Sequence, residues 1–167
     1  DEADFTTWDL KKIFGAIDAL YQDLLTEREK LQKIPASHYA DFLQSGTMPD
    51  RLRPPLYDFV AWEALDFYTS AEQAGAQPED AFEIDAESAA LAKRSEFLAY
   101  APRTEDQDSP KLKALRIYQG LLSFHLANGN REALLDADLH RLVYVKNEAF
   151  GEGKNRRFRE RLEELLA

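Results

Sequence analysis

Few residues of this chain combine a type and a spacing that could do chemistry. The three histidines are His38, His125 and His140, and His140 lies four residues after Asp136. A carboxylate and an imidazole one helical turn apart can share a metal ion, but this spacing more often makes a surface ion pair. No histidine belongs to an H-E-x-x-H pattern, and the chain has no cysteine. We therefore expect no metal site and no cofactor.

The candidates for nucleophilic or phosphate chemistry are equally sparse. Ser123 lies two residues before His125, and side chains at that spacing on a helix do not face each other. The Gly-rich segment GEGKN at 151–155 lacks the spacing of a P-loop and is better explained as a helix connector. We expect a chain that is not an enzyme. The alternative is a hydrolase whose site, around His125 or His140, assembles only in three dimensions.

Charge is distributed unevenly along the chain. The 21 basic and 31 acidic residues give a net charge of −10, which opposes binding to nucleic acid or to an anionic membrane surface. The segment KNRRFRER at 154–161 nevertheless holds five bases and one acid. It is expected to pair with the acidic stretch 76–110 or with a neighbouring domain of a longer protein.

Aromatic side chains on a polar helix face suggest a second contact surface. Phe59 and Trp62 lie among acidic residues, away from the main apolar stripe of their predicted helix. Another helix of the same domain could cover them, or a partner could. The residues predicted to contact a neighbouring domain or partner are therefore Phe59, Trp62, Arg156, Arg157 and Arg159.

Helical periodicity and helix-breaking residues predict the elements of the first half. A long helix is expected from about residue 7 to residue 33, with Thr6 or Thr7 as its cap and Pro35 after its end. A short helix should follow over 36–44, then a loop over 47–55. The next helix is expected over 56–73, with Pro55 in its first turn.

The second half contains stronger helix signals. Ser109-Pro110 predicts the start of a helix that continues to about residue 127, and Asn128-Gly129-Asn130 predicts a turn with Asn130 as the next cap. The following helix is expected over 131–149, and a last one from residue 154 to residue 167. A weaker pattern suggests a helix over 86–99 capped by Asp85. The residues of the 131–149 helix expected to point inward are Leu135, Leu139, Leu142 and Val143.

These elements predict an all-α fold without a sheet. Antiparallel helix pairs should stack as an α-solenoid-like, TPR-like bundle, because the pair from Ser109 to Asn147 has about the length of a tetratricopeptide unit. Residues 1–167 are expected to form a single helical domain and to be a fragment of a larger multi-domain protein. No run of 18 apolar residues occurs, so this segment is not expected to insert into a membrane.

Four segments together resemble the helical region of the large secreted alpha-2-macroglobulin-like proteins of Bacteroidetes. They are DFTTWDL at 4–10, RPPLYDFVAWEALDFY at 53–68, SPKLKALRIYQGLLSFH at 109–125 and ALLDADLHRLVYV at 133–145. The resemblance implies a periplasmic, cell-surface or secreted host that traps and inhibits proteases. Because the chain has no cysteine, the Cys–Gln thioester of reactive family members cannot lie in it.

Two functions follow as expectations. The first is a non-catalytic helical scaffold or interaction module of such a host, whose partners are neighbouring domains of the same chain and, through the host, proteases. The alternative is a free-standing TPR-like module that binds a peptide or protein. Neither involves nucleic acid.

Overall fold

The computed structural model describes residues 5–43, 47–70 and 80–166. Within these residues the chain forms helices and no β-strand, so the all-α prediction is confirmed. Its contacts divide it into two compact units, Asp1–Phe67 and Tyr68–Ala167. Since two such units can belong to one domain or to two, the single-domain assignment stays a prediction, as does the solenoid-like stacking.

The first unit begins with a short 3-10 turn, Phe5–Thr7, and helix α1, Leu10–Thr26. The prediction of Thr6 or Thr7 as the cap was wrong: the Asp9 carboxylate accepts the Lys12 N–H at 2.8 Å. The prediction of one helix over 7–33 was also wrong, because α1 ends before Glu27 and a short helix α2, Arg28–Leu31, follows. At the break the Thr26 hydroxyl donates to the Asp23 carbonyl at 2.6 Å, a contact that bends helices.

Helix α3, Leu56–Thr69, packs on α1 through aromatic rings. The Phe67 ring lies 6.0 Å from that of Phe14 and 5.5 Å from that of Tyr21. The start of α3 is fixed by the backbone, since the Leu56 N–H donates to the Ile34 carbonyl at 2.7 Å. The predicted continuation to residue 73 was wrong at residue 70, because α3 ends at Thr69 and residue 70 forms a bend, while residues 71–73 lie outside the described residues.

Between α2 and α3 the chain forms only 3-10 turns in its described part, Ala36–Tyr39 and Asp50–Leu52. The α-helix predicted over 36–44 is therefore reduced to one 3-10 turn as far as residue 43, and residue 44 lies outside the described part. The Ala36 N–H donates to the Pro54 carbonyl at 2.9 Å, so this segment begins by pairing with the residues before α3.

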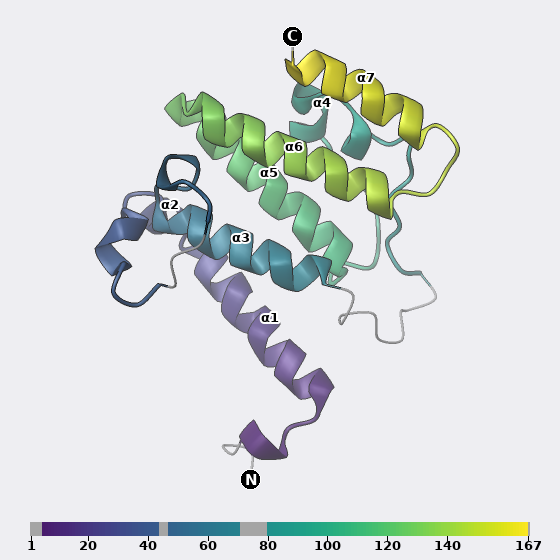
Figure 1. Cartoon of the computed structure of the whole chain (residues 1–167). Coiled ribbons are helices and arrows are strands. Elements are labelled where there is room, and N and C mark those ends of the chain that lie inside the picture. The colour runs from purple at the N-terminus through teal and green to yellow at the C-terminus, as the bar shows by residue number, and fades with distance from the viewer. Residues whose placement is uncertain (1–4, 44–46, 71–79, 167) are drawn as a thin grey trace. The chain divides into compact units, whose positions relative to one another are not determined.

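The second unit is built on a helical hairpin of α5, Pro110–Asn128, and α6, Arg131–Glu148, which lie side by side (Figure 1). Its sequence signals are confirmed. The Ser109 hydroxyl caps α5 at Leu112, Gly129 adopts a left-handed φ of 74°, and the Asn130 side chain accepts the Ala133 N–H at 3.1 Å. Helix α7, Lys154–Leu166, packs against α6.

The helix predicted over 86–99 was wrong in form. Residues 89–91 make a 3-10 turn, Ala89–Leu91, and residues 94–98 make the short helix α4, Arg94–Leu98. Ser88, not Asp85, caps the first of them, its hydroxyl accepting the Ala90 N–H. The physical reason is that arginines from α6 and α7 take the carbonyls that a continuous helix would use internally, as described below.

The face of α6 that points inward also differs from the prediction. Leu142 is buried and Leu135 half-buried, but Leu139 and Val143 are exposed. Small and charged residues take the inner face instead, together with Leu134: Ala133, Ala137, Asp138, Arg141 and Val145. Asp138 and Arg141 carry opposite charges, and because they pair with each other both can be buried on this inner face.

A pocket lined by arginines between α4, α6 and α7

Asp138 and Arg141 form a buried ion pair on the inner face of α6. Arg141 Nη2 lies 2.7 Å from Asp138 Oδ1, and Arg141 Nε donates to the same oxygen at 2.9 Å. From α4, Arg94 Nε donates to the other carboxylate oxygen of Asp138 at 2.8 Å. One buried carboxylate therefore binds two guanidinium groups, which leaves one positive charge in excess.

The rest of the Arg141 guanidinium is satisfied by backbone and by an aromatic ring. Its Nη1 donates to the carbonyls of Ala90 at 2.7 Å and Ala92 at 3.1 Å. Its carbon Cζ lies 4.5 Å from the centre of the Phe97 ring, within cation–π range. Only about 1% of Arg141 is exposed, so these contacts replace nearly all of its hydration.

Burial lowers the pKa of Arg141, the charge and hydrogen bonds of Asp138 oppose this, and the positive charges of Arg94 and Arg161 lower it further. A guanidinium nevertheless stays protonated at any physiological pH. Arg94 and Arg161 lower the pKa of Arg141 because these three arginines, from helices α4, α7 and α6, lie close enough to act on one another. A site with this excess of cations favours an anion.

A cavity of about 450 Å³ opens beside this pair. We call it the α4–α6–α7 pocket. Its basic lining residues are Lys93, Arg94, Arg131, Arg141 and Arg161, and its acidic ones are Asp138 and Glu164. A pocket with more than twice as many bases as acids is unexpected in a chain of net charge −10.

The basic residues of the pocket carry more positive charge than its acidic residues neutralise. Within the described residues, Arg131 makes no ion pair or hydrogen bond, and neither terminal nitrogen of Arg94 has a partner. Two other basic residues that line the pocket form ion pairs: Lys93 lies 3.4 Å from Glu96, and Arg161 lies 3.1 Å from Glu164. The uncompensated charge is thus concentrated on Arg94, with its buried neighbour Arg141, and on Arg131.

Leucines make the apolar part of the wall. Leu134 and Leu142 are buried beneath the pocket, whereas Leu135 from α6 and Leu165 from α7 are half-buried. Apolar carbon beside guanidinium groups with an excess of positive charge offers a ligand both an apolar contact and charged hydrogen bonds, the usual composition of a binding site.

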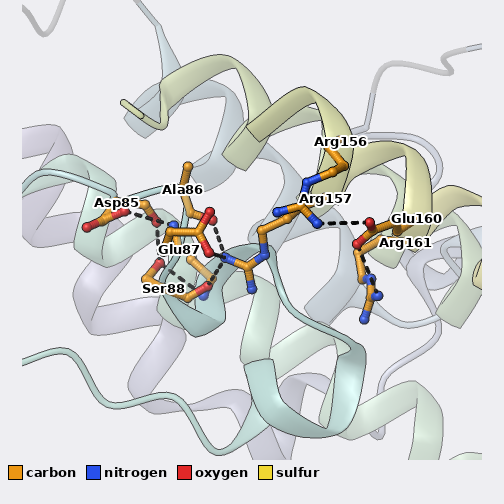
Figure 2. A network of polar contacts seen from close by, with 9 residues as sticks. Asp85, Ala86, Glu87, Ser88, Arg156, Arg157, Glu160 and Arg161 are labelled. Atoms are coloured by element: carbon orange, nitrogen blue, oxygen red, sulfur yellow. Dashed lines mark hydrogen bonds and ion pairs between the residues drawn. The ribbon is translucent and has the colours of Figure 1, made fainter. Parts of the chain in front are cut away.

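Arg157 fixes the position of α7, and with it the wall that carries Arg161. Its Nη1 donates to the carbonyls of Ala86 and Ser88, the latter at 3.2 Å, and it lies 3.8 Å from Glu87 (Figure 2). These acceptors belong to a loop that is itself held by Asp85, whose carboxylate accepts the Glu87 N–H at 2.8 Å. The helix is therefore anchored one turn before Arg161.

The backbone between α6 and α7 is tied to the same loop. The Phe150 N–H donates to the Ile84 carbonyl at 3.0 Å, and the Ala86 N–H donates to the Phe150 carbonyl at 2.9 Å. Gly151, at a φ of 108°, lets the chain turn immediately afterwards, and a side chain there would meet Ala86 at 3.2 Å. The Phe150 hydrogen bonds before this turn and the Arg157 hydrogen bonds after it fix the chain between α6 and α7 on the 84–88 segment.

The three arginines predicted to contact a neighbouring domain or partner have different surroundings. Arg157 turns toward the 85–88 loop of its own unit, so the basic run does pair with the acidic 76–110 stretch. Arg156 is exposed and lies 3.1 Å from Glu160. Arg159 is exposed and makes no ion pair with the described residues. Contact of these residues with a partner stays a prediction.

The two aromatic candidates lie in the first unit. Trp62 is only 6% exposed, and the Arg53 guanidinium covers its ring at 4.1 Å, so it offers a partner little area. Phe59 is half-buried. Neither residue is among those that line the α4–α6–α7 pocket.

The histidines do not converge. His140 Nε2 lies 3.7 Å from Asp136 Oδ1 on α6, the contact expected from their i, i+4 spacing. His125 is buried in α5 with its ring 5.0 Å from that of Phe124. Among the described residues no three His, Asp or Glu side chains are grouped as a metal site. None of the described helices is both long and apolar enough to span a membrane.

Among the residues that line the pocket, Leu135 and Leu142 are predicted from the sequence to point inward, but the charged residues are not predicted to form a site. The sequence identifies Arg161 only as part of the basic run, and its patterns assign no role to Lys93, Arg94, Arg131, Asp138 or Arg141. A signal existed: Asp138 and Arg141 are spaced i, i+3 on one helix face that also carries Ala137 and Val145. A charged pair among inward-facing positions indicates burial, but its third member, Arg94, is 44 residues away.

A second, shallower hollow of about 630 Å³ lies between residues 80–83 and residues 100–105. Its charged lining consists of Asp80, Glu83 and Glu105 against Arg103. An acidic hollow is what the overall charge of the chain predicts, so it is less informative than the basic pocket.

Comparisons of the chain with models of protein families, with curated proteins and with solved structures found no match.

Proposed function

We propose that this chain is a non-catalytic helical interaction module and that its binding surface is the α4–α6–α7 pocket. The observation that carries the proposal is an excess of positive charge beside half-buried leucines in an otherwise acidic protein: Arg131 has no described ion pair, and Arg94 and Arg141 share the single carboxylate of Asp138. Exposed Arg131 and the free terminal nitrogens of half-buried Arg94 are available to a partner, and arginine is enriched at interface positions that dominate binding.

The pocket is rigidly framed, which suits binding. Arg141 is fixed by five contacts to Asp138, Ala90, Ala92 and Phe97, and α7 is anchored by Arg157. A preformed site loses little conformational entropy when a ligand enters.

The host of this module is proposed to be a secreted, alpha-2-macroglobulin-like protein of the periplasm or cell surface that traps proteases. The support is the resemblance of four segments, which follow one another in the order of that family. In such a host the pocket would take a segment of a neighbouring domain. The test is the complete reading frame: an export signal and successive β-sandwich patterns support this host, and a frame without β-rich domains overturns it.

The second candidate is a free-standing TPR-like module that binds a peptide. The α5–α6 hairpin favours it, because two antiparallel helices joined by a short turn at Gly129 are the repeating unit of such modules. The solenoid-like stacking belongs to this proposal. A frame that encodes further helix pairs of the same length would favour it over the macroglobulin host.

The interaction function itself can be tested without knowing the partner. Random peptides displayed on phage would be selected on the immobilised chain and the clones retested on variants. We expect enriched clones that lose binding to Arg131→Gln and Arg94→Gln but keep it on Arg159→Gln, an exposed arginine of α7 outside the pocket. Enrichment that is indifferent to all three substitutions would refute the pocket as the binding surface.

A further inference from the structure

From the charges and the apolar wall of the pocket we infer that its ligand is an acidic peptide segment: a carboxylate bound by Arg131 and Arg94, with a neighbouring apolar side chain on Leu135 and Leu165. This inference rests on the proposed function and specifies its ligand. Arginines also bind phosphate groups, so the features that favour a carboxylate over a phosphate decide the identity of the ligand.

Charge compensation within the pocket sets the charge of the ligand. Asp138 neutralises one of the two guanidinium groups that bind it, Glu164 neutralises Arg161, and Glu96 neutralises Lys93. The excess that remains is one positive charge shared by Arg94 and Arg141 and one positive charge on Arg131. A ligand with one or two carboxylates matches this excess, whereas a polyphosphate chain exceeds it and meets the acidic remainder of the protein.

The guanidinium geometry favours an acceptor group with two adjacent oxygens. Arg94 lines the pocket and uses Nε for Asp138, so its two terminal nitrogens remain as parallel donors for a ligand. Two parallel N–H groups match the two oxygens of a carboxylate or of a phosphate. Asp138 holds Arg94 in this orientation, so the donors are placed before the ligand arrives.

The remaining wall discriminates between these two acceptors. Glu164 lines the pocket with its side chain 56% exposed, and it would repel a doubly charged phosphate more than a singly charged carboxylate. Leu135 and Leu165 give an apolar contact that a free phosphate cannot use and that a peptide side chain can. Carboxylate and apolar group together describe a peptide in which Asp or Glu adjoins Leu or a similar residue.

The decisive experiment compares two blocked peptides of equal size, acetyl-GLDELG-amide and acetyl-GLNQLG-amide, titrated into the intact 167-residue chain. Amide chemical shifts in ¹H–¹⁵N spectra report the site. We expect the acidic peptide to shift amides around Lys93, Arg131 and Leu165, and the neutral one to bind at least about ten-fold more weakly, the factor lost with one good charged contact. Binding should also weaken as salt is raised.

Variants separate the pocket from general charge. Arg131→Gln, at an exposed position, should weaken the acidic peptide by about ten-fold without disturbing the fold, whereas Arg159→Gln, an equal change of charge on the surface of α7, should leave its affinity unchanged. Equal weakening by both would mean that only the overall charge attracts the peptide, and the inference would be overturned.

Other outcomes also overturn the inference and distinguish it from the proposed function. If inorganic phosphate shifts the same amides with equal affinity and competes with the peptide, the site recognises phosphate. If the neutral peptide binds as well as the acidic one, the ligand is a peptide but the carboxylate is not recognised. In both cases the interaction function stands if displayed peptides still depend on Arg131, and it falls with the inference if they do not.

Discussion

Arg141 donates two hydrogen bonds to one carboxylate oxygen of Asp138, three residues earlier on the buried face of α6, and two more to the carbonyls of Ala90 and Ala92. One guanidinium thus neutralises a buried acid and also donates hydrogen bonds to backbone carbonyls of a segment that is not a continuous helix. The inner face of α6 and the irregular path of residues 86–99 have the same cause.

Removing Arg141 should be severely destabilising. Arg141→Met leaves Asp138 buried with Arg94 as its remaining described ion-pair partner, and it leaves two carbonyls without their donor, so we expect a loss of about 3–5 kcal/mol in the free energy of unfolding measured with urea. The double variant Asp138→Leu/Arg141→Met should be less destabilised than the two single losses added together, by about 1–3 kcal/mol. Simple additivity would show that the pair is not coupled.

Neighbouring arginines of α7 should differ in their effect on stability. Arg157→Ala removes hydrogen bonds from a charged group to the carbonyls of Ala86 and Ser88 and should cost about 1.5–3 kcal/mol. Amide hydrogen exchange should rise along α7 before it rises in α5. The control is Arg156→Ala, whose exposed pair with Glu160 should contribute less than about 0.5 kcal/mol. Equal effects of the two substitutions would mean that Arg157 does not anchor the helix.

Two glycine-to-alanine substitutions should have opposite signs. Gly15 lies inside α1, is exposed and has no atom within 4 Å of the place that a Cβ would take, so Gly15→Ala should stabilise by about 0.5–1 kcal/mol. Gly129 has equal space but a φ of 74°, so Gly129→Ala should destabilise by about 1 kcal/mol or more. Thermal unfolding of both variants tests this, and Gly129→Asn should recover part of the loss.

Stability should fall in alkaline solution because of a buried phenol. Burial raises the pKa of Tyr57 from 10.0 to about 12, Asp58 adds to the rise, and Arg28 opposes it. Between these two values the unfolded chain releases the proton and the folded chain keeps it, so the unfolded state binds fewer protons and stability decreases as pH rises. The contribution is present in full below about pH 10 and declines by up to about 1.4 kcal/mol per pH unit above it.

Tyr57→Phe removes the ionisable group and should flatten this part of the pH dependence, measured by urea unfolding between about pH 9 and pH 12. Tyr39→Phe, at an exposed tyrosine of the same unit, is the control and should keep the slope of the parent protein. A slope unchanged by Tyr57→Phe would assign the alkaline loss to other groups.

The helix boundaries that were predicted correctly depend on local chemistry alone. Ser109-Pro110 starts α5, and Gly129-Asn130 ends one helix and caps the next, because caps and left-handed turns are determined by residues a few positions apart. Competition between nearby polar side chains also explains why the predicted cap and end of the first helix were wrong. Asp9 caps the first helix in place of Thr6 or Thr7, and the Thr26 hydroxyl bonds the Asp23 carbonyl where the helix ends and periodicity predicted its continuation.

The pocket could not be predicted from the sequence because its lining residues meet only in the tertiary structure. An all-α chain, the α5–α6 hairpin and a basic last helix can be predicted from composition and short-range spacing alone. The sequence could not determine that Arg141 points inward while Leu139 and Val143 point outward. That choice requires the carboxylate of Asp138, the carbonyls of Ala90 and Ala92 and the ring of Phe97 to meet one guanidinium. Burial of a charge is favourable only when all these partners are present, and they come from segments about 50 residues apart.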